Sequence, residues 1–159
     1  MDTLSPEQRH RNMAAIRSRD TKPEVAVRRL LFSLGYRFRL QRRDLPGCPD
    51  IVLPRYKLAI FVNGCFWHRH EGCRYASVPA TREAFWRAKF LENAARDQRS
   101  YARLRDLGWE VMVIWSCEVR EMVRTRRIPG LPPRGEPSAP PIGAECGAPG
   151  GVSERPGLS

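Results

Sequence analysis

Apolar side chains recur at helical spacing in several stretches of the chain. Residues 5–17 begin with serine and proline, and residues 21–34 begin with threonine followed three residues later by glutamate; both are typical helix starts. A longer helical pattern covers residues 81–107 and stops at a glycine, and a last short helix is expected to begin near Ser116. The pattern therefore predicts two N-terminal helices, one long helix in the second half and a short helix after it.

Four shorter stretches have the pattern of β-strands. Residues 36–40 alternate in polarity, residues 50–53 form a short strand after a turn, and residues 58–62 are a continuous apolar run typical of a buried central strand. Residues 109–115 give the strongest strand signal. The order helix–helix–strand–strand–strand–helix–strand–helix predicts a mixed α/β domain in which helices pack on a small sheet.

The C-terminal part of the chain has a different composition. Residues 128–159 contain 8 prolines and 7 glycines, almost half of that stretch. Such a segment cannot bury enough apolar surface to offset the entropy of its chain. We therefore expect a folded domain over residues 1–127 and a disordered, Pro- and Gly-rich tail over residues 128–159.

The balance of charge narrows the choice of partners. The chain has 159 residues and a formal net charge of +11, and the tail contributes −1, so the basic residues gather in the folded part. A pI near 10.3 favours a polyanionic partner, with nucleic acid first and an anionic membrane surface second. The sequence contains neither a run of roughly 18 apolar residues nor an apolar secretion segment, so we expect a cytoplasmic protein with no membrane span.

Cysteine and histidine residues gather in one short loop. The chain has five cysteines, an odd count that argues against a disulfide framework. Residues 65–73 read CFWHRHEGC, with two thiols and two imidazoles, and a further cysteine follows at a distance. Four such ligands suit a tetrahedral structural zinc site, which we assign to Cys65, His70, Cys73 and Cys117. The alternative is one or two buried cysteines and surface histidines. Cys48 and Cys146 stay unassigned.

A second group of polar residues lies at the ends of neighbouring predicted strands. Asp50 follows Pro49 at the start of one strand, and Asn63 ends the next. A carboxylate, a backbone carbonyl and phosphate oxygens are the hard ligands that Mg²⁺ prefers, and such an ion can activate water beside a phosphodiester. The alternative is that Asp50 only caps a turn.

The segments that contain these features also resemble a known protein family. Residues 45–73, LPGCPDIVLPRYKLAIFVNGCFWHRHEGC, resemble the core of the very short patch repair (Vsr) endonucleases, which nick DNA at mismatches and have a restriction-endonuclease-like fold. Residues 12–24, 78–97 and 107–118 resemble flanking segments of that family. The resemblance covers nearly all of the expected domain and none of the tail. It implies a restriction-endonuclease-like core, a small mixed sheet flanked by helices, with a structural zinc site.

The resemblance also implies roles for individual residues. Asp50 and the backbone carbonyl of Val62 correspond to ligands of a catalytic Mg²⁺ ion, and His68 corresponds to the general base that activates water. Glu24 matches an acidic residue that orients water, and Asp97 matches a residue that supports the site. The four zinc ligands proposed from their spacing match the zinc ligands of the family.

Aromatic residues near the same loop match a wedge that enters DNA beside the mismatch. These are Phe66, Trp67 and Trp86, and Met13 matches a residue that inserts from the other groove. Unstacking a base step costs a few kcal/mol, and the cost is lowest at a mispair. The alternative for each aromatic residue is packing in the core.

Two positions depart from the family pattern. The family carries a second histidine where this chain has Asn63, and asparagine cannot shuttle a proton, although it can hydrogen-bond a phosphate oxygen. The loop between His70 and Cys73 is also one residue longer than expected, with Gly72 able to absorb the insertion.

Together with the basic charge, the resemblance implies a Mg²⁺-dependent endonuclease that nicks one strand 5′ to the T of a T·G mispair, the lesion left when 5-methylcytosine deaminates. The expected partner is double-stranded DNA with such a mispair, bound by a monomer at the nucleoid, with mismatch-repair proteins as further partners. One alternative is a restriction-type or structure-specific nuclease. Another is a zinc-stabilised DNA-binding module without catalysis, which the loss of histidine at Asn63 favours.

Overall fold

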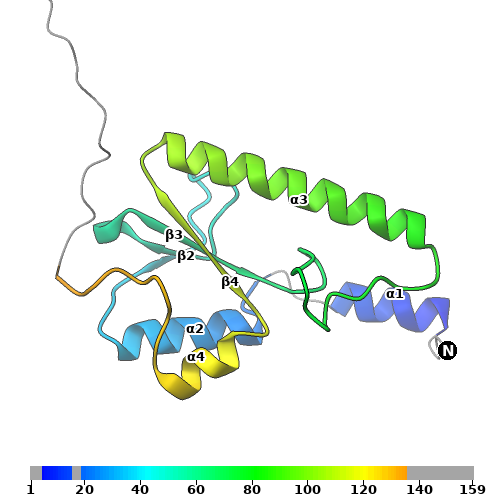
Figure 1. Cartoon of the computed structure of the whole chain (residues 1–159), viewed down its shortest axis with the longest axis horizontal. Coiled ribbons are helices and arrows are strands. Elements are labelled where there is room, and N and C mark those ends of the chain that lie inside the picture. Colours follow the sequence, from blue (N-terminus) through cyan, green and yellow to red (C-terminus); the bar gives the residue numbers. More distant parts are fainter. Residues whose placement is uncertain (1–4, 16–18, 136–159) are drawn as a thin grey trace, which may run out of the picture.

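The computed structural model describes residues 5–15 and 19–135 of the chain. It is an α/β fold with one sheet, as Figure 1 shows. In chain order the elements are α1 (Pro6–Ala15), α2 (Lys22–Ser33), β1 (Arg39–Leu40), β2 (Ile51–Leu53), a 3-10 turn (Pro54–Tyr56), β3 (Leu58–Asn63), α3 (Glu83–Asp106), β4 (Glu110–Trp115) and α4 (Val119–Thr125).

The sheet is mixed, as the order of the elements predicts. Its strands lie in the order β1-β2-β3-β4. β1, β2 and β3 pair antiparallel, whereas β3 and β4 are parallel and joined through α3. A parallel pair needs such a long crossover connection, which explains why the longest helix stands between these two strands.

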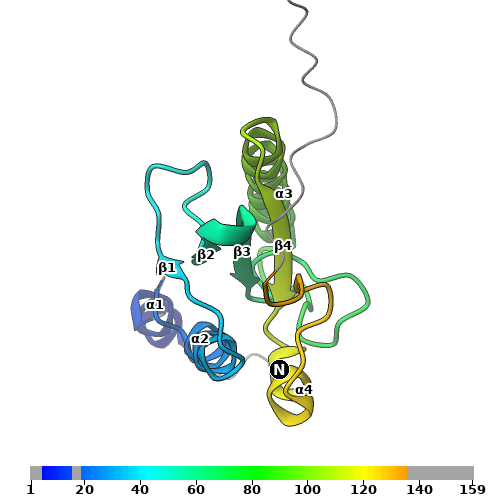
Figure 2. The same ribbon diagram turned by 90° about the vertical axis from the view of Figure 1, so that its left-hand side faces the viewer.

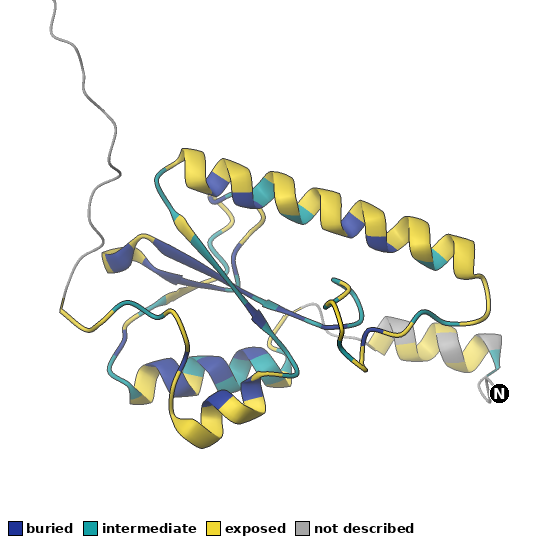
Figure 3. Cartoon of the chain, in the orientation of Figure 1, coloured by how far each residue is buried: buried dark blue, intermediate teal, exposed yellow. Residues whose placement is uncertain are grey.

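Helices cover both faces of the sheet. α2 and α4 lie on one face and α3 on the other, as Figures 1 and 2 show. Ile60 belongs to the apolar cluster on the α2 and α4 side, whereas Ala59 and Phe61 belong to the cluster under α3. Because successive side chains of a strand point to opposite faces, β3 is apolar at nearly every position and almost entirely buried (Figure 3).

The helix boundaries follow the predicted signals closely. Thr21 caps α2, and its hydroxyl oxygen accepts the backbone N–H of Glu24. α3 ends at Asp106, and Gly108 adopts φ +81°, the left-handed conformation expected after a helix. α4 begins at Val119, three residues later than predicted, because a turn occupies the residues before it.

The strand predicted over residues 36–40 is shorter in the structure. Only Arg39–Leu40 pairs in the sheet, with Leu40 opposite Ile51 and Arg39 opposite Val52. The partner β2 has three residues, so it offers few ladder positions to β1. Alternation in sequence marked an extended segment, but the length of the partner strand limits the pairing.

Residues 128–135 pack on the domain, past the predicted boundary after residue 127. Ile128 is buried, and the Tyr36 hydroxyl donates to the carbonyl of Pro132 at 2.6 Å. The backbone N–H of Gly135 donates to the hydroxyl oxygen of Tyr56 at 3.3 Å. These contacts join residues 128–135 to the helices and strands, whereas the domain boundary itself stays a prediction. The remainder of the tail, 136–159, lies outside the described residues, and its disorder stays a prediction.

The described residues include no helix that is both long and apolar enough to cross a bilayer.

Candidate active site and metal centre

An open cavity of about 830 Å³ lies at the end of β3, beside α2 and α3. Every residue that the sequence analysis assigned to catalysis lines it: Glu24, Asp50, Val62, Asn63, His68 and Asp97. They come from the first turn of α2, the start of β2, the end of β3, the loop after β3 and the middle of α3. The fold therefore brings together residues that are up to 73 positions apart in the chain.

Asp50 and Val62 meet where the β2–β3 ladder ends. Ile51 pairs with Ile60, so the ladder continued by two positions would set Pro49 opposite Val62. Proline has no amide hydrogen and cannot donate to the carbonyl of Val62. The N–H of Val62 instead donates to Oδ2 of Asp50 at 2.8 Å. N–H and C=O of one strand residue point to the same edge, so the carbonyl of Val62 faces the side on which the Asp50 carboxyl lies.

The surroundings of Asp50 disfavour its charge in the absence of a cation. The pKa of the Asp50 carboxyl is raised from an ordinary value of 3.8 to about 6, mainly by burial and also by the nearby Glu24 carboxylate. The hydrogen bond from Val62 and the charge of Arg28 lower this pKa and oppose the shift in part. The half-buried Asp50 carboxyl and the backbone carbonyl of Val62 are hard oxygen donors of the kind that Mg²⁺ prefers.

Glu24 is buried, and both of its carboxylate oxygens have protein donors. Thr21 Oγ1 donates to Oε1 at 3.0 Å, and the N–H of Asp20 donates to Oε2 at 3.0 Å. Arg28 adds an ion pair to Oε2 at 3.2 Å. These bonds offset the cost of taking the carboxyl group out of water. They also point Glu24 towards the cavity without leaving it free to move.

His68 is held by Asp97 from α3. The two side chains approach to 2.5 Å between Nδ1 of His68 and Oδ2 of Asp97. A carboxylate at Nδ1 accepts the hydrogen of that nitrogen, which leaves Nε2 with a lone pair. An imidazole in this state can accept a proton at Nε2. The predicted general base and the predicted supporting residue are therefore in direct contact.

Asn63 has a partner that the sequence analysis missed. Its Nδ2 donates to the hydroxyl oxygen of Tyr101 at 3.1 Å, and both side chains are buried. Burial raises the pKa of the Tyr101 hydroxyl, so the phenol keeps its proton. Tyr101 follows Asp97 by four residues on α3 and so lies on the same helical face. That spacing is the signal by which the sequence could have indicated it.

The loop before β2 lies close against α3 because of a glycine. Gly47 adopts φ +74°, and a Cβ there would lie 2.7 Å from the Cβ of Ser100. Only glycine fits this approach. The loop is thereby held beside α3 immediately before Asp50.

Basic side chains surround the acidic centre of the cavity. Arg19, Arg43, Lys89 and Arg96 line its walls. The sequence analysis did not single out Lys89 or Arg96. Cations at the rim of an acidic centre are suited to a polyanion that must approach a metal ion.

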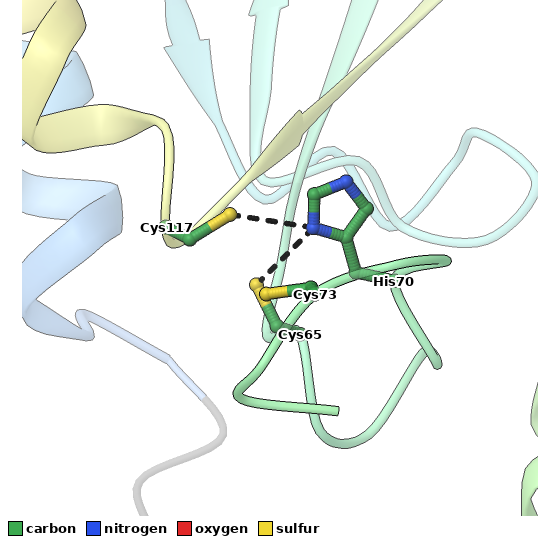
Figure 4. A group of neighbouring side chains, drawn as sticks. All are labelled: Cys65, His70, Cys73 and Cys117. Carbon is green, nitrogen blue, oxygen red and sulfur yellow. Dashed lines mark hydrogen bonds between the residues drawn. The ribbon is translucent and has the colours of Figure 1, made fainter. Parts of the chain in front are cut away.

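The four predicted zinc ligands come together beside this cavity. The ligand atoms of Cys65, His70, Cys73 and Cys117 all lie within 4.8 Å of one another. Nδ1 of His70 is 3.3 Å from Sγ of Cys117 and 3.7 Å from Sγ of Cys65, and Figure 4 shows the four side chains converging. Three thiols and an imidazole are a donor set for zinc or a similarly soft metal ion.

The surroundings of the thiols suit metal binding. Burial opposes ionisation of Cys65, but hydrogen bonds from Ser116 and neighbouring groups outweigh it and lower its pKa to about 7. The pKa of Cys117 is raised to about 12, by burial and by Cys65 and Cys73. A cation removes this repulsion among the sulfurs. The ring of His70 also stacks on Trp115, with centroids 4.4 Å apart.

The predicted wedge residues form one aromatic cluster at the N-terminal end of α3. Phe66 has its ring 5.1 Å from Trp67 and 5.5 Å from Trp86, and it contacts Phe90 of α3. All three predicted residues are half-buried, whereas Phe90 is buried. The cluster is thus partly core and partly surface. The side chain of Met13, on α1, lies outside the described residues.

Sequence comparison found a matching family model and several similar proteins. Residues 1–74 match the family model described as DNA mismatch endonuclease Vsr. The chain is 54% identical over 121 residues to the type II nicking enzyme V.XorIIP of Xanthomonas oryzae, covering 76% of this chain and 88% of that protein. It is 46% identical over 112 residues to the DNA mismatch endonuclease Vsr of Escherichia coli, covering 70% and 71%. The type II nicking enzyme V.NmeAIP of Neisseria meningitidis is 39% identical over 119 residues, covering 75% and 84%.

Proposed function

Because this chain belongs to the Vsr family of DNA mismatch endonucleases, we propose that it nicks one DNA strand 5′ to the T of a T·G mispair, with Mg²⁺ as cofactor. The chain is an endonuclease, and its mixed sheet flanked by helices is the restriction-endonuclease-like fold of that family. The observation that carries the proposal is the meeting of Asp50, the Val62 carbonyl and the His68–Asp97 pair in one cavity.

Each of these groups has a step that its geometry supports. The Asp50 carboxylate and the Val62 carbonyl would hold Mg²⁺, which supplies positive charge to the scissile phosphate and lowers the pKa of a bound water. His68 accepts a proton from the attacking water at Nε2, and Asp97 stabilises the imidazolium that results. Glu24, already bonded on both oxygens, orients the polar groups around Asp50.

The second metal has a structural role in this proposal. Zinc bound by Cys65, His70, Cys73 and Cys117 would join the segment after β3 to the segment after β4. His68 lies between two of these ligands, so the metal would fix the loop that carries the general base.

Mispaired duplexes test the function directly. Labelled duplexes with each of the mispairs, and a matched duplex, are incubated with the protein and Mg²⁺, and nicks are mapped on both strands. The expected result is one nick, 5′ to the T of T·G, that depends on Mg²⁺. Equal nicking of matched and mispaired duplexes would favour a restriction-type or structure-specific nuclease, and binding without nicking would favour the DNA-binding module. The cytoplasmic location, the monomeric state and mismatch-repair partners stay predictions.

We predict that Asp97→Asn lowers the nicking rate by about 10²-fold or more, the contribution typical of general base catalysis. An amide no longer stabilises the imidazolium of His68, and it can present a donor to Nδ1. DNA affinity is expected to fall little or not at all, because a carboxylate makes no attractive contact with a phosphate group. The measurement is single-turnover nicking together with a binding titration. Asp106→Asn, which removes an exposed acid at the far end of α3, is the control and should nick like the wild type.

We predict that Trp67→Ala lowers the preference for mispaired over matched DNA by roughly tenfold or more, since base–aromatic stacking contributes about 1–3 kcal/mol. The backbone of the loop is expected to stay in place, because Asn93 Nδ2 donates to the Trp67 carbonyl at 3.1 Å whatever the side chain. Competition binding with the two duplexes measures the ratio. Phe32→Ala removes an exposed aromatic ring from α2, away from the cavity, and should leave the ratio unchanged. An unaltered preference in Trp67→Ala would indicate that Trp67 only packs within the aromatic cluster and does not contact the mispair.

A further inference from the structure

Asn63 and Tyr101 form a buried pair inside the catalytic cavity. Both side chains are over nine-tenths buried and line the cavity that holds Asp50 and His68. Their contact joins Nδ2 of Asn63 to the hydroxyl oxygen of Tyr101 at 3.1 Å. A buried amide costs free energy unless it is hydrogen-bonded, so this contact holds the amide in place.

Tyr101 is itself held firmly in two ways. It stands on α3, and its ring packs against Phe61 of β3 with centroids 4.9 Å apart. Asp97 lies one helical turn before it and binds His68. One face of α3 therefore presents two successive side chains, and each of them holds one polar residue of the cavity: Asp97 holds His68 and Tyr101 holds Asn63.

The backbone of Asn63 is also fixed. Its carbonyl accepts the N–H of Ser116 at 2.9 Å, at the end of the parallel β3–β4 pair. With the main chain fixed and Nδ2 bonded to Tyr101, the side-chain oxygen Oδ1 is turned away from the phenol. This oxygen is the acceptor that Asn63 can offer to a water molecule or another donor in the cavity.

We propose that Tyr101 is a positioning residue of the nicking reaction, which acts by holding the Asn63 amide so that its oxygen can orient the attacking water. The inference rests on the proposed function, because it assigns Asn63 a task at the same site. An asparagine alone could rotate and exchange the places of its oxygen and nitrogen. The hydrogen bond to the phenol restricts this rotation. In the orientation that the structure has, it leaves Oδ1 as the acceptor at a position where the family carries a histidine.

A double-mutant cycle tests the inference. Single-turnover nicking of the best duplex is measured for the wild type, Tyr101→Phe, Asn63→Ala and the double variant, with melting curves for each. Tyr101→Phe keeps the ring that packs on Phe61 and removes only the hydroxyl. We expect it to lower the nicking rate about tenfold, with unchanged KM for DNA, the loss expected for one hydrogen bond. In the Asn63→Ala background the same change should have no further effect. If Asn63→Ala does not fold, Asn63→Leu takes its place.

The outcomes separate this inference from the proposed function. An equal loss from Tyr101→Phe in both backgrounds, or no loss in either, would overturn the role of Tyr101, even if the wild type nicks T·G duplexes. A wild type that nicks matched and mispaired DNA equally would overturn the mismatch specificity, whereas a non-additive cycle on that DNA would still support Tyr101. Hydrogen exchange of the Asn63 side-chain amide adds a readout without catalysis. It should become at least several-fold faster in Tyr101→Phe, and an unchanged exchange rate would contradict the hydrogen bond.

Discussion

Asp50→Asn is expected to abolish Mg²⁺-dependent nicking and, at the same time, to make the metal-free protein more stable at neutral pH. The carboxylate is the only side-chain oxygen of the proposed Mg²⁺ site, and an amide is a much weaker ligand for a hard cation. Metal-ion catalysis contributes several kcal/mol, so the nicking rate should fall by about 10³-fold or more.

The gain in stability follows from the pKa of Asp50. This pKa is raised to about 6 in the folded chain, mainly by burial, from an ordinary value of 3.8. Between these two values the folded protein binds more protons than the unfolded chain, so the wild type loses stability as the pH rises from about 4 to about 6. The side chain of asparagine does not ionise, so the variant does not lose stability in this way. Above about pH 6 the variant should therefore be more stable, by at most about 3 kcal/mol on the basis of about 1.4 kcal/mol per pKa unit.

Denaturant unfolding of both proteins in EDTA, at pH values from 4 to 8, measures the difference. It should be small near pH 4, grow to its full size near pH 6 and shrink again when Mg²⁺ is added, because only the wild type binds the ion. The matched control is Asp44→Asn, which removes an exposed acid of the same loop that pairs with Arg42 outside the cavity. The control should nick normally and gain no stability. A nicking Asp50→Asn protein would contradict the proposed metal site.

The sequence predicted the residues of the site better than their contacts. Asp50 and Asn63 could be assigned to one site because they stand at the ends of strands that are neighbours in the chain. The hydrophobic pattern is enough to predict these strands. The zinc ligands could be assigned because three of them lie within nine residues. Both signals lie within short segments of the chain, so they can be recognised without knowledge of the fold.

The contacts made by α3 could not be predicted in the same way. The pattern of α3 indicates a helix, but many of its residues are polar or charged, so it does not show which polar side chains face the sheet. Asp97 was assigned through the family resemblance alone, and Tyr101 was missed because its partner lies 38 residues away. The free carbonyl of Val62 was likewise implied only by the resemblance. Its physical reason, Pro49 at the end of the β2–β3 ladder, depends on a register that only the structure gives.

Without a metal ion in the Cys/His group, the region around β3 and β4 is expected to unfold at a much lower temperature than in the metal-bound protein. Cys65 follows β3 by two residues and Cys117 follows β4 by two residues, so one ion would join the ends of these two neighbouring strands. An ion present at about a thousand times its dissociation constant stabilises the folded state by about 4 kcal/mol. The melting temperature of the chelated protein should therefore fall by roughly 10 °C or more.

The variant Cys73→Ser tests the same loss of metal and stability without a chelator. Cys73 offers one thiol to the group and follows the loop that carries His68, so its loss should remove the metal and lower nicking together with stability. The matched control is Cys48→Ser, because the Cys48 thiol is exposed and lies outside the group. Metal content is measured on both proteins after gel filtration, with melting curves and nicking assays. The wild type and Cys48→Ser should each carry one zinc ion, and Cys73→Ser should carry none.

The pKa values of the thiols add a second signature to the same experiment. Cys117 has its pKa raised to about 12 by burial, Cys65 and Cys73, so it is protonated in the metal-free protein at neutral pH. A metal ion binds thiolates, so zinc added to the apoprotein should release protons and bind more tightly as the pH rises. An apoprotein that melts at the temperature of the metal-bound form, and takes up zinc without proton release, would show that the four residues are only packed against one another. The loop that carries His68 would then depend on the aromatic cluster and Asn93 for its position.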